Sequence, residues 1–100
     1  MSNKEVWAPF WTEQDVCVWE GKLEVSAIIV TSEASPGDVT FKNGRDSGGN
    51  TILIVEGLAN RSQQMCFPKP FYLENGLYLE LGENTMGVMV VFKPISEITE

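Results

Sequence analysis

The feature that most restricts the fold of this chain is a series of short apolar runs, each ended by glycine, asparagine, aspartate or proline. In most runs apolar and polar side chains alternate, as they do in a strand with one buried face. This pattern predicts strands at residues 16–20, 23–31, 39–43, 51–56, 65–67, 71–73, 77–81 and 86–92. No stretch has the period of a long helix. We therefore expect an all-β chain, an antiparallel β-sandwich of about eight short strands with either a jelly-roll or an immunoglobulin-like topology.

Glycines and prolines predict where the strands turn and where a sheet ends. Gly21 and Lys22 join two alternating runs and fit a tight hairpin turn. Residues 43–50 form the most glycine-rich segment and are expected to be a loop. Pro68 and Pro70 cannot donate backbone hydrogen bonds, so they favour a sheet edge or a strand that changes sheets.

The N-terminal residues 1–14 differ from the rest and are predicted to form an aromatic arm, followed by a sandwich domain at 15–94 and a polar tail at 95–100. Pro9 interrupts any regular pattern in the arm. Two interpretations stay open: the arm folds over one open end of the sandwich, or it docks on a neighbouring subunit. Because interfaces favour aromatic anchors, Val6, Trp7, Phe10 and Trp11 are the candidate residues for contact with a partner protein or another subunit.

A second candidate contact lies where the alternation stops. The residues Ile28, Ile29 and Val30 are all apolar, so this stretch is expected to be covered on both faces. A central strand and a subunit contact both explain such a run. Ile28 and Val30 are therefore predicted as subunit-contact residues.

Length, charge and apolar content exclude several classes of protein. The chain has 100 residues, which fits one domain, and 43% of them are hydrophobic. The formal net charge is −7 and the basic residues are scattered, which disfavours nucleic-acid binding. No apolar run approaches the roughly 20 residues of a membrane span, and the first residues lack the apolar core of a signal peptide. Cys17 and Cys66 are accordingly expected to be reduced thiols.

Residues suited to catalysis or to cofactor binding are few. Histidine is absent, and no Walker or dinucleotide-binding motif occurs. We predict no catalytic residue, no cofactor and no metal ligand. A calcium site and a sugar-stacking surface are disfavoured alternatives. The calcium site would have Asp38, Asp46 and Asn50 as oxygen donors. The sugar would stack on exposed aromatic residues, with Trp19, Tyr72 and Tyr78 as candidates.

Three segments of the chain resemble small virion proteins of tailed phages, the decoration, cement or head-fibre subunits. Residues 21–23, Gly-Lys-Leu, lead into the apolar strand at 25–30 as in that group. Residues 38–44, Asp-Val-Thr-Phe-Lys-Asn-Gly, precede a loop and then Thr-Ile-Leu at 51–53. Residues 70–81 contain Phe71 and the run Asn-Gly-Leu-Tyr-Leu-Glu-Leu, and 86–92 matches the closing strand. The resemblance covers about residues 15–93, and Phe41-Lys42 departs from a more usual Tyr-Asp.

The resemblance implies a non-enzymatic β-sandwich that is often trimeric. Such a protein is made in the host cytoplasm, binds the major capsid protein on the virion exterior and stabilises the shell. The resemblance supplies no active site to transfer, and it implies that the partner of Val6, Trp7, Phe10 and Trp11 is a capsid protein or a neighbouring subunit. Other virion modules, such as a head-tail connector, tail or fibre protein, and a host- or glycan-binding β-sandwich remain as alternatives.

Overall fold

The computed structural model describes residues 7–95, and these residues form eight strands and no helix. Among the described residues, no helix has the length and apolar character that crossing a membrane requires. The strands are β1 (Ala8–Thr12), β2 (Val16–Trp19), β3 (Leu23–Ser32), β4 (Asp38–Asn43), β5 (Asn50–Glu56), β6 (Ser62–Leu73), β7 (Leu77–Leu81) and β8 (Thr85–Pro94).

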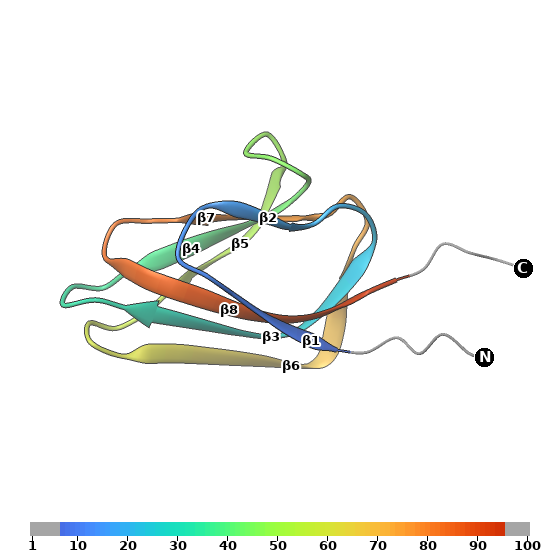
Figure 1. The fold of residues 1–100 in the computed structure, drawn as a ribbon. Coiled ribbons are helices and arrows are strands. Elements are labelled where there is room, and N and C mark those ends of the chain that lie inside the picture. Colours follow the sequence, from blue (N-terminus) through green and yellow to red (C-terminus); the bar gives the residue numbers. More distant parts are fainter. Residues whose placement is uncertain (1–6, 96–100) are drawn as a thin grey trace, which may run out of the picture.

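The strands form two four-stranded antiparallel sheets that pack face to face (Figure 1). Sheet A has the order β1-β8-β3-β6, and sheet B has the order β2-β7-β4-β5. Pairing is nested: β4 pairs with β5, β3 with β6, β2 with β7 and β1 with β8. A long hairpin that folds over itself in this way is the jelly roll, so the expected β-sandwich is confirmed and its topology is the first of the two alternatives.

The core lies between the inner faces of the two sheets, where alternate side chains of each strand meet. Ten side chains are almost completely buried: Phe41, Leu23, Ile28, Leu77, Leu79, Val25, Val30, Val39, Val88 and Val90. The one buried polar side chain among the described residues, Ser32, accepts a hydrogen bond from the backbone N–H of Gly37 at 3.1 Å. The interior is therefore apolar, with its buried hydroxyl hydrogen-bonded.

Two of the expected strands are parts of one longer strand. Residues 65–67 and 71–73 both lie in β6, the edge strand of sheet A. Ala27 pairs with Cys66 and Val25 pairs with Phe71, so residues 67–70 bulge out opposite the single residue Ser26. Prolines are tolerated at this position because an edge strand has one side without ladder bonds and a bulge interrupts pairing.

The predicted boundary between arm and sandwich at residue 14 is wrong. Residues 8–12 are strand β1, which pairs along its whole length with β8, from Ala8 opposite Phe92 to Thr12 opposite Val88. This segment therefore forms the other edge of sheet A instead of covering an open end of the sandwich. Residues 8–12 are therefore part of the sandwich and not of a separate arm.

Candidate functional site

The first candidate site is the outer side of sheet A. Two rows of facing residues cross it from β1 to β6: Trp11, Met89, Ile29 and Gln64, and next to them Pro9, Val91, Ala27 and Cys66. Trp7, Lys93, Glu24 and Tyr72 lie beyond the second row, on the same side of their strands. We call these twelve residues the sheet A face.

Six neighbouring members of the sheet A face are apolar. The outer side of a sheet in a sandwich is usually polar, so this face departs from the common pattern. Its central side chains, Ala27, Ile29, Met89 and Val91, are half-buried. The aromatic side chains at its margins are more accessible, since Trp7, Trp11 and Tyr72 are 37%, 45% and 47% exposed. Isolated exposed apolar residues are common, but a contiguous group with aromatic residues and few charges is typical of the centre of a protein interface.

Trp11 is held flat against the sheet. A side-chain carbon built on Gly87 would lie 2.3 Å from Cζ2 and 2.5 Å from Cη2 of Trp11, so the six-membered ring covers this glycine. The indole Nε1 donates a hydrogen bond to Oε2 of Glu13 at 3.1 Å. The ring is thus oriented before any partner binds, which lowers the entropy that an aromatic anchor loses on binding.

Trp7 is oriented by charged neighbours at the margin of the same face. The ammonium Nζ of Lys93 lies 4.9 Å from the centre of the Trp7 ring, within the range of a cation–π interaction. The same nitrogen is 3.7 Å from Oε1 of Glu24, so these two charges balance one another. The pair of charges beside Trp7 therefore adds no net charge to the sheet A face.

The outer side of sheet B has the opposite character. Its central strands β7 and β4 place Tyr78 opposite Lys42, and Glu80 opposite Thr40. Nζ of Lys42 forms an ion pair with Oε2 of Glu80 at 3.1 Å and also donates to the backbone oxygen of Ser47 at 2.8 Å. This polar side, which we call the sheet B face, is suited to contact with water.

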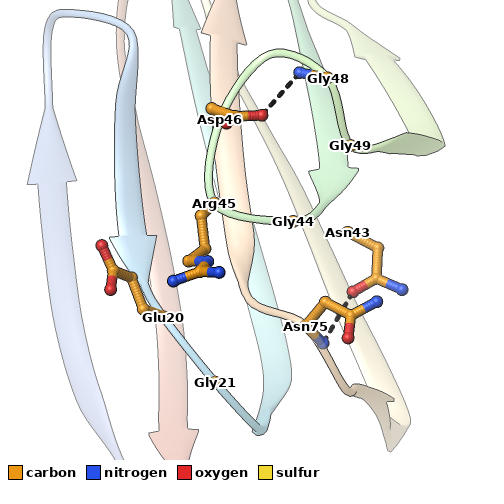
Figure 2. A pocket seen from close by; sticks show the side chains of 9 residues that line it. All are labelled: Glu20, Gly21, Asn43, Gly44, Arg45, Asp46, Gly48, Gly49 and Asn75. Atoms are coloured by element: carbon orange, nitrogen blue, oxygen red, sulfur yellow. Dashed lines mark hydrogen bonds between the residues drawn. The ribbon is translucent and has the colours of Figure 1, made fainter.

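A second candidate site is an open hollow of about 570 Å³, which we call the loop-end hollow. It lies at the end of the sandwich where the loop between β4 and β5 projects (Figure 1). Glu20 and Arg45 line one side of it, and Asn43 and Asn75 line the other (Figure 2). Oδ1 of Asn43 accepts a hydrogen bond from the backbone N–H of Asn75 at 3.1 Å. The hollow is polar and shallow, unlike the mostly apolar clefts that bind small molecules.

The aromatic candidates predicted from the N-terminal segment have different positions. Trp7 and Trp11 lie on the sheet A face, as a contact role requires. Phe10 points to the opposite side of β1 and is half-buried against the core, so it is not part of the sheet A face. Val6 lies outside the described residues.

Ile28 and Val30 cannot be subunit-contact residues in this fold. Both side chains are completely buried between the sheets. Their strand β3 is central in sheet A, which was the other interpretation of the apolar run. Only Ile29, between them, points outward, and it belongs to the sheet A face.

Four members of the sheet A face are not among the contact residues predicted from the sequence: Ala27, Ile29, Met89 and Val91. The available signal was the loss of alternation in both 27–30 and 88–92, where consecutive apolar residues cover both sides of a strand. Pairing of β3 with β8 brings the two outward sets together. The sequence does not show that these two strands are neighbours.

The structure separates the residues named for the two disfavoured alternatives, the calcium site and sugar stacking. Asp38 begins β4, whereas Asp46 lies in the loop beyond its other end. The described part of the chain contains no group of three or more cysteine or carboxylate side chains placed to hold a metal. Tyr72 lies on the sheet A face, whereas Trp19 and Tyr78 belong to sheet B, so the three aromatic residues do not form one surface.

The two cysteines are free and lie on different sheets, Cys17 in β2 and Cys66 in β6. Burial raises the pKa of the Cys17 thiol, and Cys66 is exposed. Because the thiolate is the reactive form, iodoacetamide at pH 8 should label Cys66 several-fold faster than Cys17. Peptide mass spectrometry over a time course measures both rates, and the chain unfolded in guanidinium is the control in which the rates should converge. Faster labelling of Cys17 in the folded chain would contradict this placement.

Comparison with known proteins adds no relative from which a site can be transferred. No protein-family model matches the chain, and no curated protein is significantly similar to it. The sheet A face and the loop-end hollow are therefore candidate sites on their geometry and chemistry alone.

Proposed function

We propose that this chain is a non-enzymatic structural subunit of a virion, a decoration or cement protein that attaches to the outside of the major capsid shell. The observation that carries the proposal is the difference between the two outer sides of the sandwich. The sheet A face is apolar and presents oriented tryptophans, whereas the sheet B face is polar and carries an ion pair. One side is suited to burial on a partner and the opposite side to solvent.

The fold and the charge are compatible with this role. Jelly rolls occur in viral capsid proteins, although they also occur in lectins and in other proteins, so the fold does not decide the function. The net charge of −7 favours solubility and keeps particles apart when the sheet B face points outward. The local resemblance to phage decoration proteins over residues 15–93 is the reason for naming a capsid as the partner.

Attachment to capsids that lack the subunit is the direct test. The purified chain should co-sediment with shells of the phage that carries its gene, and Met89→Arg should weaken attachment about 30-fold or more, because it places an unpaired charge at the centre of the buried face. Thr40→Arg is the matched control, since it makes the same addition of charge on a central strand of the sheet B face. This control should attach as the unchanged chain does.

The two ways in which this test fails have different meanings. If the unchanged chain does not bind the shells, the decoration function is wrong. If it binds and Met89→Arg binds equally well, the function stands but the sheet A face is not the attachment surface. Circular dichroism of each variant shows whether the sandwich has remained folded.

A glycan-binding module is the second candidate, and one observation favours it. Trp19 is 38% exposed and directly precedes Glu20 and Gly21, which line the loop-end hollow. An aromatic ring beside amide and carboxylate groups is a common arrangement for stacking and hydrogen bonding to a sugar. Screening the chain on a glycan array, with Trp19→Ala as the comparison, separates this function from capsid attachment.

A further inference from the structure

The four edge strands of the sandwich differ in how well they are protected from pairing with another strand. β1 contains Pro9, β6 contains Pro68 and Pro70 together with its bulge, and β2 has only four residues and a register shift. Proline, bulges and shortness are the usual means of blocking an edge. β5 has seven residues, Asn50–Glu56, with no proline and no basic residue. Its only irregularity is a bulge at Ile52, so β5 is the less protected edge of sheet B.

The side chains of β5 are also suited to contact with another strand. Leu53 and Val55 face the core opposite Phe41 and Val39. Ile54 points to the sheet B face, opposite Thr40, and is 57% exposed. A large aliphatic side chain at the middle of an open edge, on a side that is otherwise polar, would lose much of its contact with water if a strand were added there.

We infer that β5 pairs antiparallel with β5 of a second copy of this chain, about a two-fold axis that passes beside Ile54. Residues directly opposite in an antiparallel pair point to the same side of the sheet. Centring the pair on Ile54 therefore places the two Ile54 side chains against each other. It also places Leu53 opposite Val55 of the second copy, both on the core side. The bulge at Ile52 then falls near the end of the ladder, where it disturbs pairing least.

Charge supports a second copy in this orientation. The only charged side chain of β5 is Glu56, at its last position. In the antiparallel pair each Glu56 lies opposite Ile52 of the other copy, so the two carboxylates are about 13 Å apart at a rise of about 3.3 Å per residue. That separation exceeds the Debye length of about 8 Å at physiological salt. A parallel pair would place the two Glu56 side chains next to each other and would not form a closed dimer.

The pair joins sheet B of both copies into one eight-stranded sheet and leaves the sheet A face uncovered, because β5 belongs to the other sheet. The inference therefore goes beyond the proposed function and does not depend on it. Pairing of one short strand buries less than a standard interface of about 1,600 Å², so the dimer is weak in free solution. Copies held side by side on any surface have a much higher effective concentration, and the same contact then becomes populated.

Sedimentation equilibrium of the full chain from about 10 µM to about 1 mM tests the inference. The average mass should rise with concentration from 11.1 kDa toward twice that value. Ile54→Lys, which brings two ammonium groups together at the axis, should weaken association about tenfold or more. Thr40→Lys, on the neighbouring strand and the same face, is the matched control and should associate as the unchanged chain does.

Disulfide trapping tests the register. In a chain with Cys17→Ser and Cys66→Ser, Ile54→Cys should form a covalent dimer when oxidised, because Cα atoms facing each other across an antiparallel pair are about 4.5–5.5 Å apart and within disulfide range. Thr40→Cys in the same background should not. A mass that stays at one subunit at every concentration overturns the inference, as does equal trapping of both cysteine variants. A stable trimer unaffected by Ile54→Lys also overturns it and supports the trimer that the phage resemblance implies.

Discussion

Replacing Phe41 with alanine should lower the free energy of unfolding by about 3–5 kcal/mol, because it removes the largest completely buried side chain and leaves a cavity. Phe41 lies on β4 between Leu53 of β5 and Leu79 of β7, and its ring faces sheet A across the core. For a domain of this length, the loss corresponds to a fall in Tm of about 12–40 °C. Urea denaturation followed by tryptophan fluorescence measures the free energy, and thermal circular dichroism measures Tm.

Tyr72→Ala is the matched control for Phe41→Ala, because it also removes an aromatic ring but from the exposed sheet A face. It should cost about 1 kcal/mol or less. Phe41→Leu should fall between the two, since much of the volume is retained. Equal losses for Phe41→Ala and Tyr72→Ala would show that Phe41 is not at the centre of the core.

Strands with one buried face can be predicted from the sequence because burial of one side makes apolar and polar residues alternate along the strand. Val39 and Phe41, and likewise Leu77 and Leu79, face the core as their alternating patterns indicated. β1 was missed because its strand character depends on a partner far away in the sequence. Neither its aromatic composition nor Pro9 indicates a strand, and pairing with β8 is what makes it one. Pairing of the first strand with the last is a non-local property that local pattern does not contain.

The error at Ile28 and Val30 has a similarly specific cause. Leu23 and Val25 point inward, but the bulge at Ser26 inserts one residue, so that Ile28 and Val30 point inward as well. A shift of one residue exchanges the two sides of a strand, and no feature of the run Ile-Ile-Val reveals where the shift occurs. The prediction that Trp7 and Trp11 contact a partner rests on their aromatic composition. Both side chains are exposed, and the contact itself stays a prediction.

The second large effect is expected at Gly76, where alanine should lower the free energy of unfolding by about 2–5 kcal/mol. Gly76 has a φ of +122°, which residues with side chains rarely adopt. A side-chain carbon there would also lie 2.7 Å from the backbone oxygen of Trp19 and 2.9 Å from that of Gly44. The carbonyl of Gly76 accepts a hydrogen bond from the N–H of Gly44 at 3.2 Å, so this one turn holds β2 and the loop-end hollow together.

Two further glycines separate the causes of this loss. Gly21 has a φ of +118°, but a side-chain carbon there would come no closer than 3.7 Å to its nearest neighbour, Nε1 of Trp19. Gly21→Ala therefore measures backbone strain alone and should lower the free energy of unfolding by about 1–3 kcal/mol. Gly48 has neither a positive φ nor a backbone clash, because its closest contact is the Asp46 side chain at 3.2 Å. Gly48→Ala should change stability by about 1 kcal/mol or less. Denaturant midpoints should therefore fall most for Gly76→Ala, less for Gly21→Ala and least for Gly48→Ala. A Gly76→Ala chain as stable as Gly48→Ala would mean that the turn shifts freely and does not fix the hollow.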